Sequence, residues 1–291
     1  MSVRKAVILT AGYATRLLPA TKSVPKCMLP IVDRPIIDYV VEEALAAGIE
    51  QIVMVTGGSA RGIEDYFDRE FELEQILHEA GKSALLEAVR RPANTPMAFV
   101  HQRERRGNGH AVLITRDFVG DEPFAIFFAD DVIFHRTPAI RQLIDVFERF
   151  SATVLAVQRV PREQVSMYGI IQPEEIAPRT YRVQRVIEKP SADDAPSNLA
   201  TVGRFVATPA VFDVLAETRP GRAGEIWLMD AFDTLARREP VYAYEYEGER
   251  FDTGQPIGLI KAVLHVALQR DDLRPELEAY LQSLRAAEPA G

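Results

Sequence analysis

Apolar and polar positions in the first half of the chain alternate between short β-rich runs and longer helical patterns. Residues 6–10 have the pattern of a buried strand, residues 35–47 that of a helix ending at Gly48, and residues 51–56 that of the next strand. A strand, a helix and a strand joined by short connections form a βαβ unit, so we expect a parallel sheet.

Within the predicted helix 35–47, apolar residues recur with the helical period and charged residues fall between them. We expect Glu42 and Glu43 to point outward and the apolar side chains to form one buried face. That face consists of Ile36, Ile37, Val40, Val41, Ala44 and Leu45.

The same patterns predict the elements of the remaining chain, where no repeat or low-complexity linker marks a domain boundary. Beyond Met167 the pattern becomes mixed. We expect strands at 98–102, 124–128, 153–160, 168–172, 181–187, 202–206 and 241–246, and helices at 138–150, 209–217, 226–238 and 257–270.

Two polar helical segments stand apart from this pattern. Residues 65–89 form a helix-rich insertion, and residues 271–291 form a tail whose apolar residues share one helical face. Such a face must cover either the body of its own chain or a second subunit. Its members are Leu273, Leu277, Tyr280, Leu281 and Leu284.

Charge and cysteine content narrow the class of protein. A net charge of -8 argues against general binding to nucleic acid or to a membrane surface, because both would repel the chain. The single cysteine, Cys27, excludes an intramolecular disulfide and fits a reducing cytoplasm. No signal-peptide pattern and no run of transmembrane length is visible. We therefore expect a cytoplasmic protein with no nucleic-acid partner and no membrane partner, in which local cations meet any anionic substrate.

The segment 9–30 carries the most chemical information. A Gly-containing turn follows the apolar strand, and Arg16, Lys22 and Lys26 lie within eleven positions. A strand ending in such a turn exposes backbone N–H groups, and nearby fixed cations can neutralise a polyphosphate that those groups hold. The sequence therefore outlines a triphosphate site.

Ten segments, in order, resemble those of the sugar-1-phosphate nucleotidyltransferases, and specifically the bacterial UTP:glucose-1-phosphate uridylyltransferases. The resemblance covers nearly the whole chain, and the acidic insertion at 71–74 favours the uridylyl over the thymidylyl branch. The segments are 11–22, 25–30, 63–68, 71–74, 107–112, 130–131, 188–190, 202–206, 224–226 and 251–254.

The resemblance implies an α/β protein with a Rossmann-like three-layer α/β/α fold and a mixed, mainly parallel central sheet. It implies a catalytic domain at 1–270, a C-terminal helical tail at 271–291, and a homodimer or homotetramer. The implied reaction is attack of glucose 1-phosphate on the α-phosphorus of UTP, assisted by Mg²⁺, which gives UDP-glucose and pyrophosphate. Because the nucleophile needs no deprotonation, the protein's task is alignment and charge neutralisation.

The resemblance also assigns the residues that bind the nucleotide and the metal. Arg16 is expected on the triphosphate side and Lys26 near the reacting phosphates, both as catalytic cations, with Lys22 farther out. Asp130, after the strand 124–128, and Asp252 are the expected Mg²⁺ ligands. The nucleotide-binding residues are Ala11, Gly12, Gln102, Gly107 and Asp130, among which the Gln102 carboxamide offers uracil both a donor and an acceptor. For the neighbouring Asp131, two interpretations stay open: a residue of the same site, or an ordinary loop residue that faces solvent or caps a helix.

The sugar phosphate is assigned to Gly169, Glu188, Lys189 and Gly203. The Glu188 carboxylate would accept sugar hydroxyls, and Lys189, the third catalytic cation, would meet the phosphate. A side chain at Gly203 would crowd the sugar ring.

Four residues depart from the family pattern. Ala14 stands at a usual Gly, and Cys27 stands at a usual Glu. We expect Cys27 to be a packed residue, since the reaction needs no covalent intermediate. Trp227 and Met229 replace smaller polar residues near the expected sugar pocket, a change that could alter which hexose fits.

Other functions stay open at this point. Gln102 cannot separate uracil from thymine, so dTTP or another hexose 1-phosphate is an alternative. A catalytically silent homologue is disfavoured, because the cations and carboxylates named above are present. A dinucleotide-binding oxidoreductase is also disfavoured, because residues 56–58 lack the acidic residue expected at a ribose.

Overall fold

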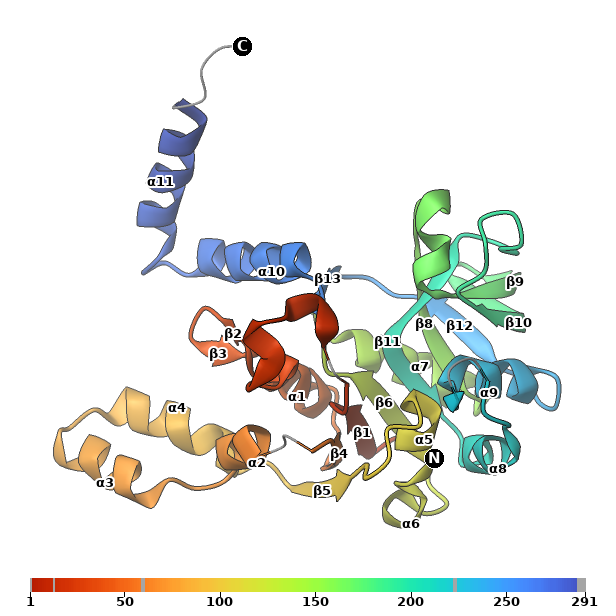
Figure 1. Cartoon of the computed structure of the whole chain (residues 1–291), viewed down its shortest axis with the longest axis horizontal. Helices are drawn as coiled ribbons and strands as arrows, with labels where there is room; N and C mark the ends of the chain where they lie inside the picture. Colours follow the sequence, from red (N-terminus) through yellow and green to blue (C-terminus); the bar gives the residue numbers. More distant parts are fainter. Residues whose placement is uncertain (1, 13, 59–60, 222–223, 287–291) are drawn as a thin grey trace.

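A nine-stranded mixed sheet forms the centre of the molecule in the computed structural model, which describes residues 2–12, 14–58, 61–221 and 224–286 (Figure 1). One half is parallel, in the order β5 (Met97–His101), β4 (Gln51–Thr56), β1 (Lys5–Leu9), β6 (Phe124–Phe128). The other half continues with β11 (Leu199–Ala207), β8 (Val154–Arg159), β12 (Tyr242–Glu245), β10 (Thr180–Glu188) and β9 (Gly169–Ala177), in which only the β8–β12 pairing is parallel. The expected mixed sheet with a βαβ beginning is confirmed, but the sheet is not mainly parallel as expected: four of the eight neighbouring pairings in this order are antiparallel, because the strands beyond β6 pair mostly by antiparallel ladders.

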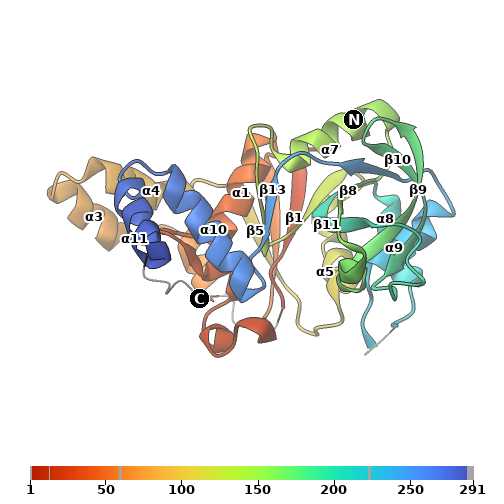
Figure 2. The same ribbon diagram turned by 90° about the horizontal axis from the view of Figure 1, so that it is seen from above.

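Helices cover both faces of this sheet, so the fold has three layers (Figure 2). Side chains of β1 alternate between the faces: Ala6 and Ile8 pack in one core cluster and Val7 in the other. The first cluster lies under α1 (Ile36–Ala46) and α7 (Ala139–Phe150). The second lies under α5 (Asn108–Leu113), α8 (Ala210–Glu217) and α9 (Leu228–Ala236). The predicted three-layer α/β/α architecture is therefore confirmed.

The predicted strands and long helices are all present, with small shifts at their ends. The exception is β9, which extends to Ala177, five residues beyond its expected end. The pattern missed β2 (Pro30–Ile31), β3 (Arg34–Pro35), β7 (Asp131–Phe134) and β13 (Glu249–Asp252). Two to four residues carry too little periodicity to be recognised.

The expected outward position of Glu43 is wrong. Glu43 is buried and accepts hydrogen bonds from Arg204 of β11, at 3.1 Å to Oε1 and 2.7 Å to Oε2. The fully buried Arg204 guanidinium also donates to the carbonyl oxygens of Gly203 at 2.8 Å and Asp131 at 2.7 Å. Helical periodicity places a glutamate on a face, but it cannot reveal an arginine that a distant strand brings to that face.

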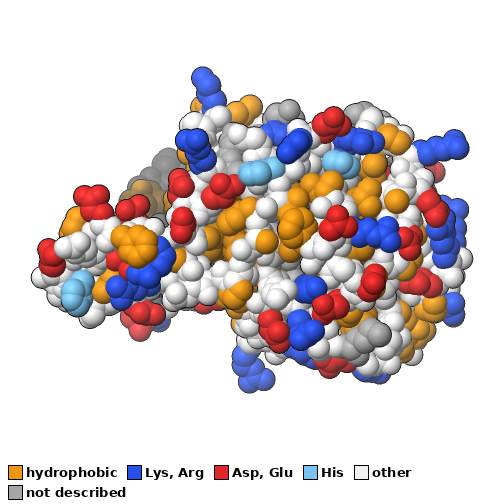
Figure 3. Space-filling view, turned by 90° about the horizontal axis from the view of Figure 1, so that it is seen from below, with side chains coloured by type: hydrophobic (Ala, Val, Ile, Leu, Met, Phe, Trp, Pro, Cys, Tyr) orange, Lys and Arg blue, Asp and Glu red, His pale blue; other side chains and the backbone are white. Residues whose placement is uncertain are grey.

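The polar insertion forms an arm of α2 (Arg61–Phe67), α3 (Phe71–Glu79) and α4 (Ser83–Ala93), as expected. It projects from the body and is the narrower part of the molecule in Figure 3, with charges of both signs on its surface. The buried Glu74 of α3 accepts from Arg69 at 2.8 Å and from Arg90 of α4 at 2.7 Å. This contact joins the two outer helices of the arm.

The C-terminal segment consists of α10 (Pro256–Gln269) and α11 (Arg274–Ala286); residues 287–291 of the predicted tail, like Tyr13 of the first loop, lie outside the described residues. α10 packs on β13 and β2, whereas α11 contacts α10 and leads away from the body (Figure 1). Tyr280 is 59% exposed and Leu284 is 49% exposed. The body of the chain therefore leaves part of the apolar face of the tail exposed, whereas Leu273, Leu277 and Leu281 on the same face are half-buried.

Candidate active site

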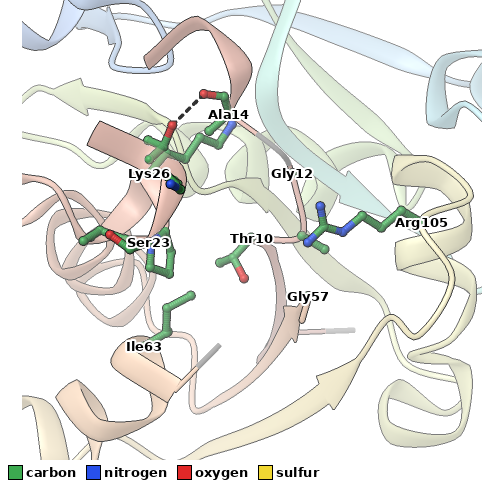
Figure 4. Close-up of a pocket in the computed structure, with 13 residues that line it drawn as sticks. Thr10, Gly12, Ala14, Ser23, Lys26, Gly57, Ile63 and Arg105 are labelled. Carbon is green, nitrogen blue, oxygen red and sulfur yellow. Dashed lines mark hydrogen bonds between the residues drawn. The ribbon is translucent and has the colours of Figure 1, made fainter. Parts of the chain in front are cut away.

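Two pockets adjoin at the edge of the sheet where β1 and β6 end. The first, which we term the loop pocket, has a volume of about 230 Å³ and follows β1 (Figure 4). The second, the strand pocket, has a volume of about 190 Å³ and lies between β6, β9, β10 and β11. The loop pocket is lined by Thr10, Ala11, Gly12, Ala14, Thr21, Lys22, Ser23, Val24, Pro25, Lys26, Gly57, Ile63 and Arg105. The strand pocket has among its lining Arg16, Asp130, Asp131, Gly169, Glu188, Lys189, Gly203, Trp227, Met229, Arg250 and Asp252.

In the loop pocket, the cationic side chains of Lys26 and Arg105 lie beside the backbone of Gly12 and Gly57. Lys26 lies on one side of the pocket and Arg105 on the other, with Gly12 and Gly57 between them (Figure 4). A Cβ built on Gly57 would lie 3.3 Å from Arg105 Nη2, so the guanidinium lies directly on the backbone there. Sequence reasoning missed Arg105; its only signal was the basic run 103–106 before Gly107.

The loop residue Ala14 has a backbone conformation that favours glycine. Its φ is 51°, in the left-handed region, and Thr21 Oγ1 donates to its carbonyl at 2.9 Å (Figure 4). Alanine at this position therefore leaves local strain in the loop.

An ion pair between Lys26 and Asp130 joins the two pockets, because Lys26 lines the first and Asp130 the second. Burial alone would raise the pKa of Asp130, but the Lys26 ammonium outweighs burial and lowers that pKa below its usual range. For Lys26, burial alone would lower the pKa, but the Asp130 carboxylate raises it. Both groups are therefore charged at neutral pH.

Asp130 and Asp252 are brought together by the pairing of β7 with β13. Thr253 donates to the Asp130 carbonyl through its N–H at 2.9 Å and its Oγ1 at 2.7 Å. A Cβ built on Gly254 would lie 2.6 Å from Asp130 Oδ2 and 3.0 Å from Asp252 Oδ1, so both carboxylates face one small space. A Cβ on Gly258, in the first turn of α10, would collide with the Asp252 carbonyl.

This pair of carboxylates fits a magnesium ion. Hard carboxylate oxygens suit Mg²⁺, which usually takes one or two carboxylates and completes its shell with water and phosphate oxygens. No group of three or more His, Cys, Asp or Glu side chains that could hold a metal occurs among the described residues. The donor set thus matches a metal shared with phosphates and does not match an all-protein cage.

One of the two alternatives for Asp131 was a loop residue that faces solvent, and this alternative is wrong. Asp131 is 4% exposed, accepts from Arg250 Nε at 2.7 Å and accepts from the Gly203 N–H at 2.9 Å. Burial raises the pKa of its carboxyl, against the opposing charge of Arg250. Asp131 begins the short strand β7, which the sequence pattern did not show.

The reason for glycine at 203 also needs correction. A Cβ there would lie 2.5 Å from Phe128 Cβ and 2.7 Å from Asp131 Oδ2. The protein itself therefore excludes a side chain at this position, whatever the strand pocket contains.

Glu188 and Lys189 end β10 inside the strand pocket. Lys189 Nζ lies 3.3 Å from Glu188 Oε1, and burial raises the pKa of Glu188 above its ordinary value. The backbone of Lys189 has a φ of 48°, and its N–H donates to the Tyr168 carbonyl at 2.9 Å. A left-handed conformation in a residue with a side chain costs free energy and is typical of functional sites.

Gln102 lies beside the two pockets without lining either of them. Its buried amide Nε2 donates to the Gly107 carbonyl at 2.9 Å and lies 3.1 Å from His110 Nδ1. Gly107 has a φ of 92°, and a Cβ there would lie 2.5 Å from the Ile226 carbonyl oxygen. Contact of either residue with a nucleotide stays a prediction.

Two further expectations concern Cys27 and Arg16. Cys27 is fully buried in the core, and burial raises the pKa of its thiol to about 12, so it is a packed residue as expected. Arg16 lines the strand pocket with Lys189 and does not line the loop pocket. Its contact with a triphosphate stays a prediction.

Comparison with known proteins shows full-length similarity. The family model described as nucleotidyl transferase matches residues 5–269. A UTP–glucose-1-phosphate uridylyltransferase of Bacillus subtilis (strain 168) is 47% identical over 283 residues, which cover 97% of each chain.

Solved structures agree with these sequence matches. The structure described as a UTP-bound UGPase from Acinetobacter baumannii has a TM-score of 0.89 at 38% identity, covering 97% of this chain and 99% of that one. A UDP-glucose pyrophosphorylase complexed with UDP-glucose has a TM-score of 0.85 at 38% identity, covering 92% and 100%.

Proposed function

The chain belongs to the nucleotidyl transferase family, and we propose that it transfers a uridylyl group from UTP to glucose 1-phosphate, giving UDP-glucose and pyrophosphate. One observation carries the proposal: the loop pocket and the strand pocket meet at the Lys26–Asp130 pair. A reaction between two phosphorylated molecules requires two anion-binding pockets that share a charged boundary. Relatives of nearly the same length are named for this reaction.

In this proposal the triphosphate of UTP occupies the loop pocket. Ala11 and Gly12 offer backbone, Lys26 lies at the reacting phosphates, and Arg16 reaches them from the strand pocket. A fixed cation about 4 Å from a phosphate oxygen contributes about 4 kcal/mol at an effective dielectric near 20. Gln102, oriented by the Gly107 carbonyl, would present its Oε1 to the uracil N3–H.

The sugar phosphate occupies the strand pocket. Lys189 binds its phosphate, Glu188 accepts its hydroxyls, and the backbones of Gly169 and Gly203 form its walls. A phosphate oxygen then forms a bond to the α-phosphorus while the bond from that phosphorus to the pyrophosphate oxygen breaks. No protein group accepts a proton, so alignment and charge neutralisation account for the catalysis.

We propose Mg²⁺ as the cofactor, held by Asp130 and Asp252. The ion supplies charge neutralisation on the reacting phosphates when it is bound. Lys26, which forms an ion pair with Asp130, would lie beside the ion.

We also propose a homodimer or homotetramer in which the tail packs against a second copy. The exposed face of α11 is apolar, and a groove of about 1030 Å³ runs between the arm, α1 and α10. Its lining includes Leu73, Leu85, Val89 and Val266. Truncation after Gln269 should therefore lower the number of subunits in the assembly, which light scattering measures as the ratio of the particle mass to the subunit mass. An unchanged number of subunits would contradict this assembly.

A cytoplasmic location is part of the proposal, because the single buried cysteine fits a reducing compartment. Within the described ranges, no helix is long and apolar enough to span a bilayer.

The test of the proposed function is a panel of nucleoside triphosphates and hexose 1-phosphates assayed for pyrophosphate release. UTP with glucose 1-phosphate should give the highest kcat/KM, and EDTA should abolish the activity until Mg²⁺ is restored. A tenfold preference for dTTP or for galactose 1-phosphate would assign the same fold and chemistry to another substrate pair.

A further inference from the structure

Trp227 is the only tryptophan in the sequence, and the proposed reaction gives it no role. It lies directly before α9, with an extended backbone (φ −98°, ψ 134°), and its half-buried side chain lines the strand pocket.

The indole ring holds the ammonium group of Lys189. Lys189 Nζ lies 4.2 Å from the centroid of the Trp227 ring and 3.3 Å from Glu188 Oε1. Trp provides the strongest cation–π surface among the side chains. The Lys189 side chain is 40% exposed, so burial does not fix it and these two contacts hold its end.

The backbone of Lys189 restricts where that side chain can reach. Its φ of 48° and the hydrogen bond from its N–H to the Tyr168 carbonyl fix the direction in which the side chain leaves β10. The lysine therefore has a defined resting place at the wall of the pocket, with its charge on the indole.

The indole N–H of Trp227 forms no hydrogen bond with the described residues. Trp227 Nε1 is buried, and no described residue accepts its hydrogen bond. A buried donor without an acceptor costs free energy, so this atom does not explain why tryptophan occupies the site. The ring face, in contact with Lys189, is the part of the side chain with a favourable interaction in the pocket.

We infer that Trp227 is a positioning residue for the sugar phosphate: its ring holds the Lys189 ammonium at the wall of the strand pocket, both before the phosphate arrives and while Lys189 binds it. The inference rests on the proposed function and adds a sugar-side residue to it. It predicts an effect confined to the sugar phosphate, because the loop pocket lacks Trp227.

Fluorescence of the single tryptophan tests the contact directly. With excitation at 295 nm, titration of the full chain with glucose 1-phosphate should change the emission saturably, because the bound phosphate places negative charge beside the ammonium that lies on the ring. Lys189→Met should shift the emission of the free protein and remove most of the response. An identical response in Lys189→Met would overturn the inference, as would no response in the wild type while calorimetry shows binding.

Steady-state kinetics test the positioning role. Trp227→Leu should raise the KM for glucose 1-phosphate about fivefold, while kcat and the KM for UTP change less than twofold, and Trp227→Phe should recover part of the loss. Equal effects on both substrates, or no difference between Leu and Phe, would contradict the role. Phe150→Leu is the matched control, because Arg149 lies 5.4 Å from the Phe150 ring on α7, and that ring lines neither pocket.

The two proposals fail in different ways. If wild-type protein releases no pyrophosphate from UTP and any sugar phosphate, the proposed function fails, while the emission difference between wild type and Lys189→Met still tests the lysine–indole contact. If pyrophosphate release is normal but Trp227→Leu leaves the KM for glucose 1-phosphate unchanged, only the role of Trp227 is lost. If Trp227→Leu does not fold, Trp227→Phe and the emission titration decide the matter.

Discussion

The two halves of the sheet build their pockets by different means. The parallel half forms most of the loop pocket from the segment 10–26 after β1, and Gly57, Ile63 and Arg105 complete it. The antiparallel half forms the strand pocket from residues between 16 and 252, which buried ion pairs hold in place. A local segment can be identified from its sequence, whereas the second pocket depends on contacts between distant residues. Substrate variation is therefore easier to introduce on the sugar side.

The largest effect on stability should come from breaking the buried ion pair between Arg204 of the antiparallel half and Glu43. Arg204→Leu leaves Glu43 buried without its partner and should lower the free energy of unfolding by about 3–5 kcal/mol. Urea denaturation measures this loss. The double variant Arg204→Leu/Glu43→Leu should recover most of it, and a double variant no more stable than the single one would show that the pair is not the cause. Arg238→Leu, which breaks an exposed pair with Glu217, should change stability by less than about 1 kcal/mol.

In the first half, removal of a cation should affect rate more than stability. Lys26→Ala should lower kcat by roughly a hundredfold to a thousandfold, because charge stabilisation of the reacting phosphates is lost. Pyrophosphate release measures the rate, and circular dichroism checks the fold. Lys82→Ala, an exposed residue on the arm, is the control. Near-normal turnover by Lys26→Ala would remove Lys26 from the site.

A smaller, pH-dependent effect should distinguish the sugar side. Glu188 must be ionised to accept hydroxyls, and burial places its pKa above the ordinary 4.5. The carboxylate is therefore lost as the pH falls through this raised pKa, and the KM for glucose 1-phosphate should begin to rise before the pH has fallen to 4.5. Glu188→Gln should have a high KM that varies little with pH. A wild-type KM that stays flat as the pH falls to 4.5 would argue against a carboxylate role for Glu188.

The smallest effect should come from the strained loop itself. Ala14→Gly removes the Cβ that disfavours a φ of 51° and should raise the free energy of unfolding by about 0.5 kcal/mol after the entropy of glycine is counted. Thermal unfolding checks the sign. A clear loss of stability would mean that the Ala14 methyl group makes a favourable contact that outweighs the strain.

The parts of the fold and the site that the sequence predicts are the local ones, and the parts it misses depend on residues far apart in the chain. Strand and helix periods located β1, α1, β4 and β6, and the spacing of Arg16 and Lys26 after the first strand indicated phosphate chemistry. Glu43 and Asp131 were misjudged because their partners, Arg204 and Arg250, lie more than 100 residues away in sequence. Arg105 was missed because the charged segment 103–106 lies next to a turn, and such segments are usually exposed to solvent. No local pattern encodes such long-range contacts, which arise only when the sheet assembles.

The close packing of Gly258 on Asp252 links the far end of the molecule to the chemistry. Not even a methyl group fits between the first turn of α10 and the Asp252 carbonyl, so the start of this helix packs directly on the backbone of the proposed metal ligand. α11 follows the opposite end of that same helix. One helix thus connects the C-terminal tail to Asp252.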